Sequence, residues 1–255
     1  MRRKAFGVCL LVAVVLCASL DASAQTAPKI TSFPVSGGQR RALICKPQGS
    51  GPFPTVVFNH ASIVDSLGWP EAGRRGFQLD GFCEALAKEG YFTFAPIREL
   101  SGQGRGFMDY REEYLGIVSR ALDHVLELPE VDRSRVALMG VSMGGLVSLG
   151  VSIERADLKA LVLLAPAWGR GQMKEFVARI DGLAAPVLLL VEASDSPPIL
   201  GGVKLLEESL RNKGKELRLV RYNRGGGHEL FYAVDYWWED VRSFLREKLA
   251  ASTPR

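Results

Sequence analysis

From Arg41 onward, short apolar runs alternate with longer amphipathic stretches, and this alternation restricts the folds open to the chain. The apolar runs are brief and several are rich in β-branched residues, as in strands covered on both faces; they comprise residues 42–45, 55–59, 92–95, 136–139, 160–164, 187–191 and 217–222. Helical patterns lie between them, at residues 77–88, 109–128, 144–154, 198–212 and 234–249. Because parallel strands need right-handed crossovers, the pattern predicts a three-layer α/β fold, with a mostly parallel sheet and helices on both faces.

The N-terminus has the organisation of a secretory signal. Basic residues lead into an uncharged run that ends at Leu20, and Ala22-Ser-Ala24 offers the small side chains that a signal peptidase requires. The run is shorter than the roughly 20 residues that span a bilayer, so cleavage is favoured over a retained anchor. We therefore expect a signal peptide at residues 1–24, one domain at residues 25–255, and export to a periplasm or to the medium.

The charge of the chain does not indicate a polyanionic partner. The net charge is +4, and removal of the signal peptide takes away three basic residues and one acidic residue, which lowers it to +2. So weak and evenly distributed a charge argues against nucleic acid or a membrane surface as partner of the mature protein. No cysteine and histidine cluster has metal-ligand spacing, so neither a metal nor an organic cofactor is expected. The oligomeric state is left open.

Two cysteines, Cys45 and Cys83, remain after the signal peptide. They could form one disulfide in an oxidising compartment. Two buried thiols on separate elements are the favoured interpretation, because free cysteine is among the residue types most often buried.

A candidate nucleophile follows the predicted strand at residues 136–139. The strand runs into Gly140-Val-Ser142-Met-Gly144 and then into a helix, which is the arrangement of a nucleophile elbow. Such a turn strains the serine backbone and brings strand and helix so close that the flanking positions must be small, and glycine occupies both. A glycine-rich turn with an incidental serine, or a phosphate-binding loop, is the alternative. We predict Ser142 as the nucleophile.

A serine hydroxyl needs a base to take its proton, and the sequence has three histidines. His124 lies in a helical stretch and is expected to be structural. His60 follows the strand at residues 55–59, where a loop-ordering role is expected. His228 follows the last strand and three glycines, and it comes after the serine, as the chain order serine, acid, histidine requires. His228 is the predicted base, and a histidine in a flexible loop is the alternative.

The acid that orients the base should follow a strand that lies between the serine and the histidine in sequence. Asp195 meets this condition, because it comes just after the strand at residues 187–191. Asp157 and Asp181 precede strands, at the wrong end of the sheet, and Glu192 is expected to belong to the strand. An aspartate before a Ser-Pro pair is also a good helix N-cap, which is the alternative for Asp195.

An acyl-transfer site also needs hydrogen-bond donors for the developing oxyanion. One donor is expected to be the amide of Met143, at the start of the helix after the serine. The other is expected from the loop after residue 59, with the Ser62 amide as first choice and the Ala61 amide as fallback.

Together these residues resemble the α/β-hydrolase superfamily, and within it the serine-bearing proteins similar to dienelactone hydrolases and related carboxylesterases. The likeness covers about residues 41–249, and its most specific parts are residues 56–61, 141–145, 191–195 and 227–231. It implies the α/β-hydrolase fold, here with a small or absent lid. The chain departs from the family at two points. Alanine stands at position 61, where the family usually has glycine, and Ser142 stands where strict dienelactone hydrolases have cysteine.

The triad and the resemblance predict a serine hydrolase that cleaves carboxylic esters through an acyl-enzyme. The short segment between residues 165 and 186 leaves room only for a small lid, which suits small or soluble substrates. The alternatives are a serine peptidase on the same fold and a non-catalytic binding protein. The peptidase is less favoured because such enzymes commonly carry a large additional domain, for which this length leaves no room.

Two further groups of residues have a possible role at the site. Arg98, Arg105 and Arg111 could bind a substrate carboxylate, although a solvated basic loop is favoured. The aromatic residues near the C-terminus, including the tryptophans at 237–238, are expected to pack the last helix on the sheet, and Phe231 could face the substrate.

Overall fold

The computed structural model describes residues 27–98 and 111–251, and its centre is an eight-stranded sheet. The strands are β1 (Lys29–Val35), β2 (Gly38–Cys45), β3 (Phe53–Asn59), β4 (Phe92–Pro96), β5 (Val131–Val141), β6 (Ala160–Leu164), β7 (Val187–Glu192) and β8 (Leu217–Tyr222). Their order is β1-β2-β4-β3-β5-β6-β7-β8. The β1/β2 and β2/β4 pairs are antiparallel and all others are parallel, which confirms the predicted mostly parallel sheet.

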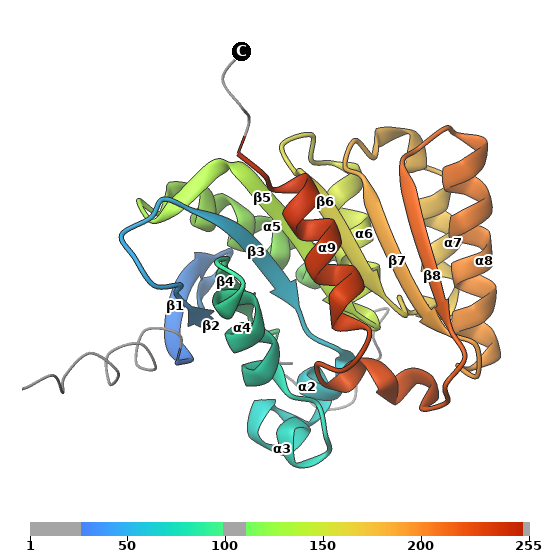
Figure 1. The fold of residues 1–255 in the computed structure, drawn as a ribbon, viewed down its shortest axis with the longest axis horizontal. Helices are drawn as coiled ribbons and strands as arrows, with labels where there is room; N and C mark the ends of the chain where they lie inside the picture. The colour runs from blue at the N-terminus through green and yellow to red at the C-terminus, as the bar shows by residue number, and fades with distance from the viewer. Residues whose placement is uncertain (1–26, 99–110, 252–255) are drawn as a thin grey trace, which may run out of the picture.

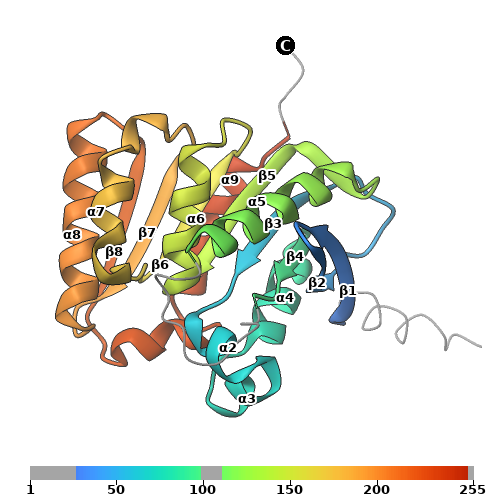
Figure 2. The same cartoon turned by 180° about the vertical axis from the view of Figure 1, so that it is seen from behind.

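Helices cover both faces of the sheet, as the sequence predicts (Figures 1 and 2). The five expected helices are α4 (Leu79–Lys88), α5 (Arg111–Glu127), α6 (Met143–Ile153), α8 (Pro197–Asn212) and α9 (Trp238–Lys248). Three short helices were not predicted: α2 (Ser62–Leu67), α3 (Trp69–Arg74) and α7 (Gln172–Val177). Helices α4 and α9 lie on one face, and α5, α6, α7 and α8 lie on the other. Within the two described ranges, no helix has the length and apolar character needed to cross a membrane.

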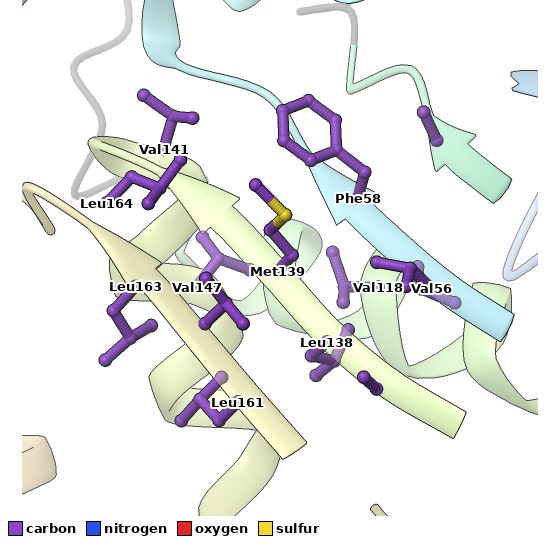
Figure 3. Packing of buried hydrophobic residues seen from close by; sticks show 14 of the residues in the cluster. Val56, Phe58, Val118, Leu138, Met139, Val141, Val147, Leu161, Leu163 and Leu164 are labelled. Atoms are coloured by element: carbon purple, nitrogen blue, oxygen red, sulfur yellow. The ribbon is translucent and has the colours of Figure 1, made fainter. Parts of the chain in front are cut away.

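The core forms where the central strands meet the helices. Figure 3 shows side chains of β3, β5 and β6 packed together with Val118 of α5 and Val147 of α6. All residues of β6 and α6 are buried, which explains why both are almost uniformly apolar in sequence. Removing one such large aliphatic side chain from water contributes about 1.5–3 kcal/mol, so the burial of these central elements contributes strongly to the stability of the fold.

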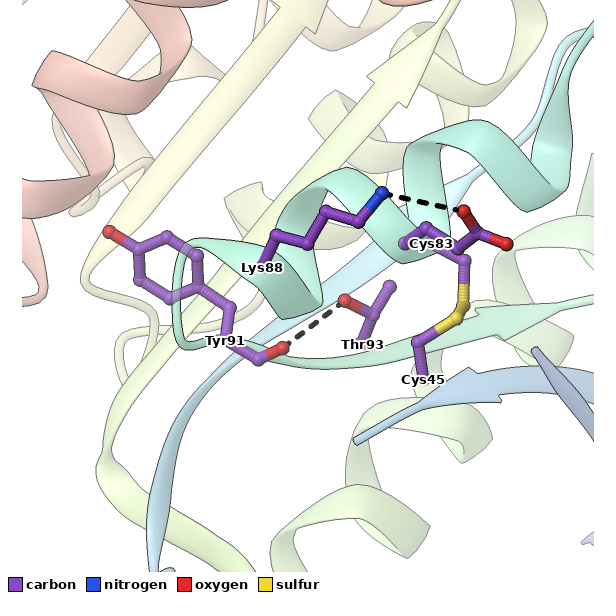
Figure 4. Close-up of a disulfide and its surroundings, with 6 residues drawn as sticks. Cys45, Cys83, Lys88, Tyr91 and Thr93 are labelled. Carbon is purple, nitrogen blue, oxygen red and sulfur yellow. Dashed lines mark hydrogen bonds and ion pairs between the residues drawn. A yellow bond between two sulfur atoms is a disulfide. The ribbon is translucent and has the colours of Figure 1, made fainter. Parts of the chain in front are cut away.

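Cys45 and Cys83 form a disulfide, so the preference for two separate thiols was wrong (Figure 4). Cys45 ends β2, Cys83 lies in α4, and their Cα atoms are 5.5 Å apart. Both side chains are completely buried. The pairing depends on how α4 packs against β2, which the separation of the two residues in sequence does not reveal.

Removal of this disulfide is expected to lower the free energy of unfolding by about 3–4 kcal/mol, because the bond closes a loop of 38 residues in the unfolded chain. The double variant Cys45→Ala/Cys83→Ala, compared with the wild type by chemical denaturation, tests the value. The wild-type protein should also resist alkylation until a reductant is added. Equal stability of the two proteins, or alkylation of both cysteines without reductant, would contradict the assignment.

Candidate active site

Ser142 lies in a sharp turn between the end of β5 and the start of α6. Its backbone angles are φ 54° and ψ −116°, a region that costs a residue other than glycine about 1–3 kcal/mol. A Cβ atom on Gly140 would lie 2.3 Å from the Gly144 carbonyl oxygen, so the first glycine of the motif is required by contact with the last. The structure thus has the strand, strained serine and helix that the motif predicts.

The N-terminus of α6 presses against the loop that follows β3. A Cβ atom on Gly144 would lie 2.1 Å from the carbonyl oxygen of Asn59 and 2.5 Å from that of His60. This close approach brings the start of α6, where Met143 is the first residue, next to the segment that contains Ala61 and Ser62. Ser62 begins α2, so the amides of Ser62 and Met143 both lie in first helical turns, where backbone N–H groups have no partner within the helix.

Alanine at position 61 fits this loop without strain. Its backbone angles, φ −70° and ψ 162°, are ordinary extended values open to any residue. The departure from the family's usual glycine therefore does not distort the loop. The oxyanion roles of Met143, Ser62 and Ala61 remain predictions.

The structure brings Asp195 and His228 together. His228 Nδ1 lies 2.9 Å from Asp195 Oδ2, and the Asp195 carboxylate is completely buried, whereas a quarter of the His228 side chain is exposed. The second carboxylate oxygen, Oδ1, accepts the amide of Ser196 at 2.6 Å. Ser196, not Asp195, is the N-cap residue of α8, so the alternative reading of Asp195 as a helix cap is wrong.

Ser142 and His228 follow parallel strands, β5 and β8, and therefore lie at the same edge of the sheet. Among the described residues, no hydrogen bond joins the Ser142 hydroxyl to His228. Catalytic hydrogen bonds of this kind commonly form or shorten only when substrate is bound. The buried, hydrogen-bonded carboxylate fixes the ring of His228 and directs its Nε2 atom away from Asp195.

His60 lies in the loop that follows β3, and both of its ring nitrogens have hydrogen-bond partners. Its Nε2 atom accepts the Arg98 amide at 3.0 Å, which leaves the proton on Nδ1, 3.0 Å from the Ala61 carbonyl oxygen. Burial, with Arg98 as a second cause, holds the pKa of His60 well below its usual value. A neutral histidine with both nitrogens engaged orders a loop rather than moving a proton.

Arg98 is completely buried, so the favoured reading of a solvated basic loop was wrong for this residue. Its guanidinium donates to the His60 carbonyl oxygen at 2.5 Å and to Asp65 Oδ2 at 3.3 Å. Burial raises the pKa of Asp65 to about 6, while Arg98 acts in the opposite direction. Arg111, in α5, is bound to Glu175 at 2.6 Å, and Arg105 lies outside the described residues.

Phe231 packs in the core, which confirms the favoured expectation, and Tyr232 also contacts the candidate base. Phe231 is completely buried and packs against Trp237, with ring centroids 5.5 Å apart, so it belongs to the core and does not face a substrate. Tyr232, which is expected together with Phe231 to pack the last helix on the sheet, lies edge-on to His228 with ring centroids 6.1 Å apart. Burial raises the pKa of Tyr232, with Glu229 and Asp195 as lesser causes, so it stays protonated beside the base.

A mostly parallel sheet with a strained serine after β5 and a histidine–aspartate pair after β8 and β7 defines an α/β hydrolase. Among the described residues, no group of three or more histidine, cysteine, aspartate or glutamate side chains could hold a metal ion. The sequence profile of the dienelactone hydrolase family matches residues 42–235. The chain belongs to that family.

Individual relatives are more distant. Acyl-coenzyme A thioesterase 6 of Homo sapiens is 29% identical over 137 residues, which cover 54% of this chain and 29% of the thioesterase. The chain thus spans less than a third of that relative. Among solved structures, a dienelactone hydrolase-like promiscuous phosphotriesterase from metagenomic libraries has a TM-score of 0.68 at 18% identity, covering 88% of this chain and 98% of the other.

A second solved structure, an acylaminoacyl peptidase in complex with a chloromethyl ketone, has a TM-score of 0.69 at 16% identity. The likeness covers 89% of this chain and 42% of the peptidase. At such identities the likeness shows a shared fold, and it does not assign the activities of these proteins to this chain.

Proposed function

We propose that this protein is a serine hydrolase that cleaves carboxylic esters of small or soluble substrates through an acyl-enzyme. The observation that carries the proposal is the 2.9 Å contact between His228 and the buried Asp195, at the edge of the sheet where Ser142 is held in a strained turn. A buried carboxylate that orients a histidine at the same sheet edge as a serine is the arrangement that can activate a hydroxyl for attack.

The chemistry follows from these positions. The Ser142 oxygen attacks the ester carbonyl carbon while His228 Nε2 takes the hydroxyl proton, and Asp195 stabilises the imidazolium that forms. The Met143 amide, with the Ser62 or Ala61 amide, donates to the oxyanion. His228 then gives the proton to the departing alkoxide, which leaves an acyl group on Ser142. Water attacks this ester with His228 again as base, which releases the acid and restores the enzyme.

The class of bond that the protein cleaves is tested by direct comparison of substrates. The names of the relatives include a thioesterase, a phosphotriesterase and a peptidase, so each of these bond types belongs in the test. The segment between β6 and β7 is short and contains only α7 and two single 3₁₀ turns, which supports small substrates over long lipids.

The experiment is a side-by-side assay of purified protein with p-nitrophenyl esters of increasing chain length, an acyl-CoA, a phosphotriester and a peptide anilide. Short-chain esters are expected to give the highest kcat/KM, and the Ser142→Ala variant serves as background. Preference for the peptide anilide would replace the proposal with a peptidase. No turnover of any substrate by folded protein would favour a binding protein.

We also propose that the protein is exported. The proposed signal peptide lies outside the described residues, and the proposal is supported by the sequence pattern together with the Cys45–Cys83 disulfide, since such bonds persist mainly in oxidising compartments. The exported protein is expected to begin at Gln25, and an N-terminal sequence that retains residues 1–24 would contradict this.

A further inference from the structure

Glu192, the last residue of β7, lies between the loop that carries Asp195 and the loop that carries His228. It is completely buried, although glutamate is almost never fully buried unless its charge is paired or hydrogen bonded. In the described part of the chain its partners are hydrogen-bond donors of these two loops rather than a cation.

Each carboxylate oxygen of Glu192 serves a different loop. Oε2 accepts hydrogen bonds from the amide of Ser194, at 2.5 Å, and from the Ser194 hydroxyl. Ser194 is the residue before Asp195. Oε1 accepts the amide of Gly225 at 3.1 Å, three residues before His228. One buried side chain is therefore hydrogen bonded both to the loop that carries Asp195 and to the loop that carries His228.

The loop that carries His228 needs an external contact to hold its position, because three consecutive glycines precede the histidine. Gly225, Gly226 and Gly227 all have positive φ, at 82°, 96° and 52°. Glycine has more backbone freedom than any other residue, so this segment does not fix the position of His228 by itself. The two loops also touch directly, since a Cβ atom on Gly227 would lie 3.5 Å from the Ser194 carbonyl oxygen.

The hydrogen bonds to Glu192 favour its charged form. Donation by the Ser194 hydroxyl, and then by the backbone amides of both loops, lowers the pKa of the Glu192 carboxyl. Hydrogen bonds to an ionised acceptor are roughly twice as strong as those between neutral groups. The connection between the loops is therefore a set of charge-assisted bonds.

We propose that Glu192 is a positioning residue that holds Asp195 and His228 in register. The inference rests on the proposed serine hydrolase function. Glu192 does not touch the reacting atoms; it acts by keeping the buried carboxylate and the imidazole within hydrogen-bonding distance, and so it determines how well His228 serves as a base.

The first test measures the rate constant of fluorophosphonate acylation at Ser142 as a function of pH. In Glu192→Gln, an NH₂ group replaces one of the two acceptor oxygens, and the rate constant is expected to fall on the order of 10²-fold, as for a catalytic group displaced by about 1 Å. The midpoint of the pH profile should move to lower pH, because the imidazolium is held less well by Asp195. Glu192→Asp keeps the charge but is one methylene shorter, and it is expected to remain slow.

Glu207→Gln is the matched control, because Glu207 is also a mostly buried carboxylate with two donors, Arg211 and Arg221, on α8 and β8. It should acylate at the wild-type rate. Ser194→Ala removes one donor from an exposed residue and should fold normally, with a rate constant about fivefold lower, the value of one hydrogen bond. If Glu192→Gln does not fold, the acylation rate constant of Ser194→Ala tests the inference in its place.

A second measurement is independent of catalysis: the NMR resonance of the His228 Nδ1 proton, which is hydrogen bonded to Asp195. It should be present in the wild type and in Glu207→Gln, and be lost or broadened in Glu192→Gln or, if that variant does not fold, weakened in Ser194→Ala. An unchanged resonance and wild-type acylation in the Glu192 variants, or full recovery with aspartate, would overturn the inference. Failure of the wild type to react at Ser142 while the resonance is intact would overturn the proposed function and not the positioning role.

Discussion

Replacement of Ser142 by alanine is expected to lower kcat for ester hydrolysis on the order of 10⁴-fold or more, with KM little changed. The reason is that, in the proposed mechanism, the acyl-enzyme forms on this hydroxyl. The residual rate reflects the oxyanion donors and binding alone. Initial rates with the best p-nitrophenyl ester measure the effect.

Ser152→Ala is the matched control for Ser142→Ala. Ser152 is a buried serine on the same helix, α6, and within the described ranges its hydroxyl bonds only to the Ser148 carbonyl oxygen, at 2.7 Å. This variant should keep wild-type kcat. Substantial hydrolysis by folded Ser142→Ala protein would show that another residue is the nucleophile.

Asp195→Asn is expected to lower kcat by about 10⁴-fold without unfolding the protein. One carboxylate oxygen must still accept the Ser196 amide, so the asparagine oxygen takes that place and its NH₂ group turns to His228. The imidazole then has to accept at Nδ1, which puts its proton on Nε2. A histidine with a protonated Nε2 cannot take the serine proton.

Asp181→Asn tests whether the effect of Asp195→Asn is specific. Asp181 precedes β7 at the opposite end of the sheet and its carboxylate is largely exposed, where it pairs with Lys213. Its replacement should leave kcat within about twofold of the wild type, since surface ion pairs contribute little. A wild-type rate for Asp195→Asn would show that Asp195 is not needed for catalysis.

The strands of the sheet differ in how readily the sequence predicts them. Strand β6 has the predicted bounds because a continuous apolar run marks a strand that is buried on both faces. The half-buried edge strand β8 also has the predicted bounds, and its apolar residues are interrupted by two arginines. β1 was missed because it is an edge strand in which only Phe33 is buried, so most of its residues face solvent and give no apolar pattern. The short helices α2 and α3 have too few residues for a helical period to be recognised.

The site divides in the same way. The location of Ser142, Asp195 and His228 at one edge of the sheet could be predicted, because each follows a strand and the topology places those strand ends together. The burial of Arg98, the disulfide and the two-loop contact of Glu192 could not, because each depends on the distance between segments that are remote in sequence. Glu192 was correctly placed in its strand, but a strand-end glutamate has no sequence signature for the contacts it makes.

Whether Ser142 is a nucleophile activated by His228 is best tested by locating a fluorophosphonate adduct by peptide mass. We expect a single adduct on Ser142, no adduct in Ser142→Ala, and a strong decrease in His228→Ala. An adduct on another residue, or no adduct on folded wild-type protein, would contradict this expectation.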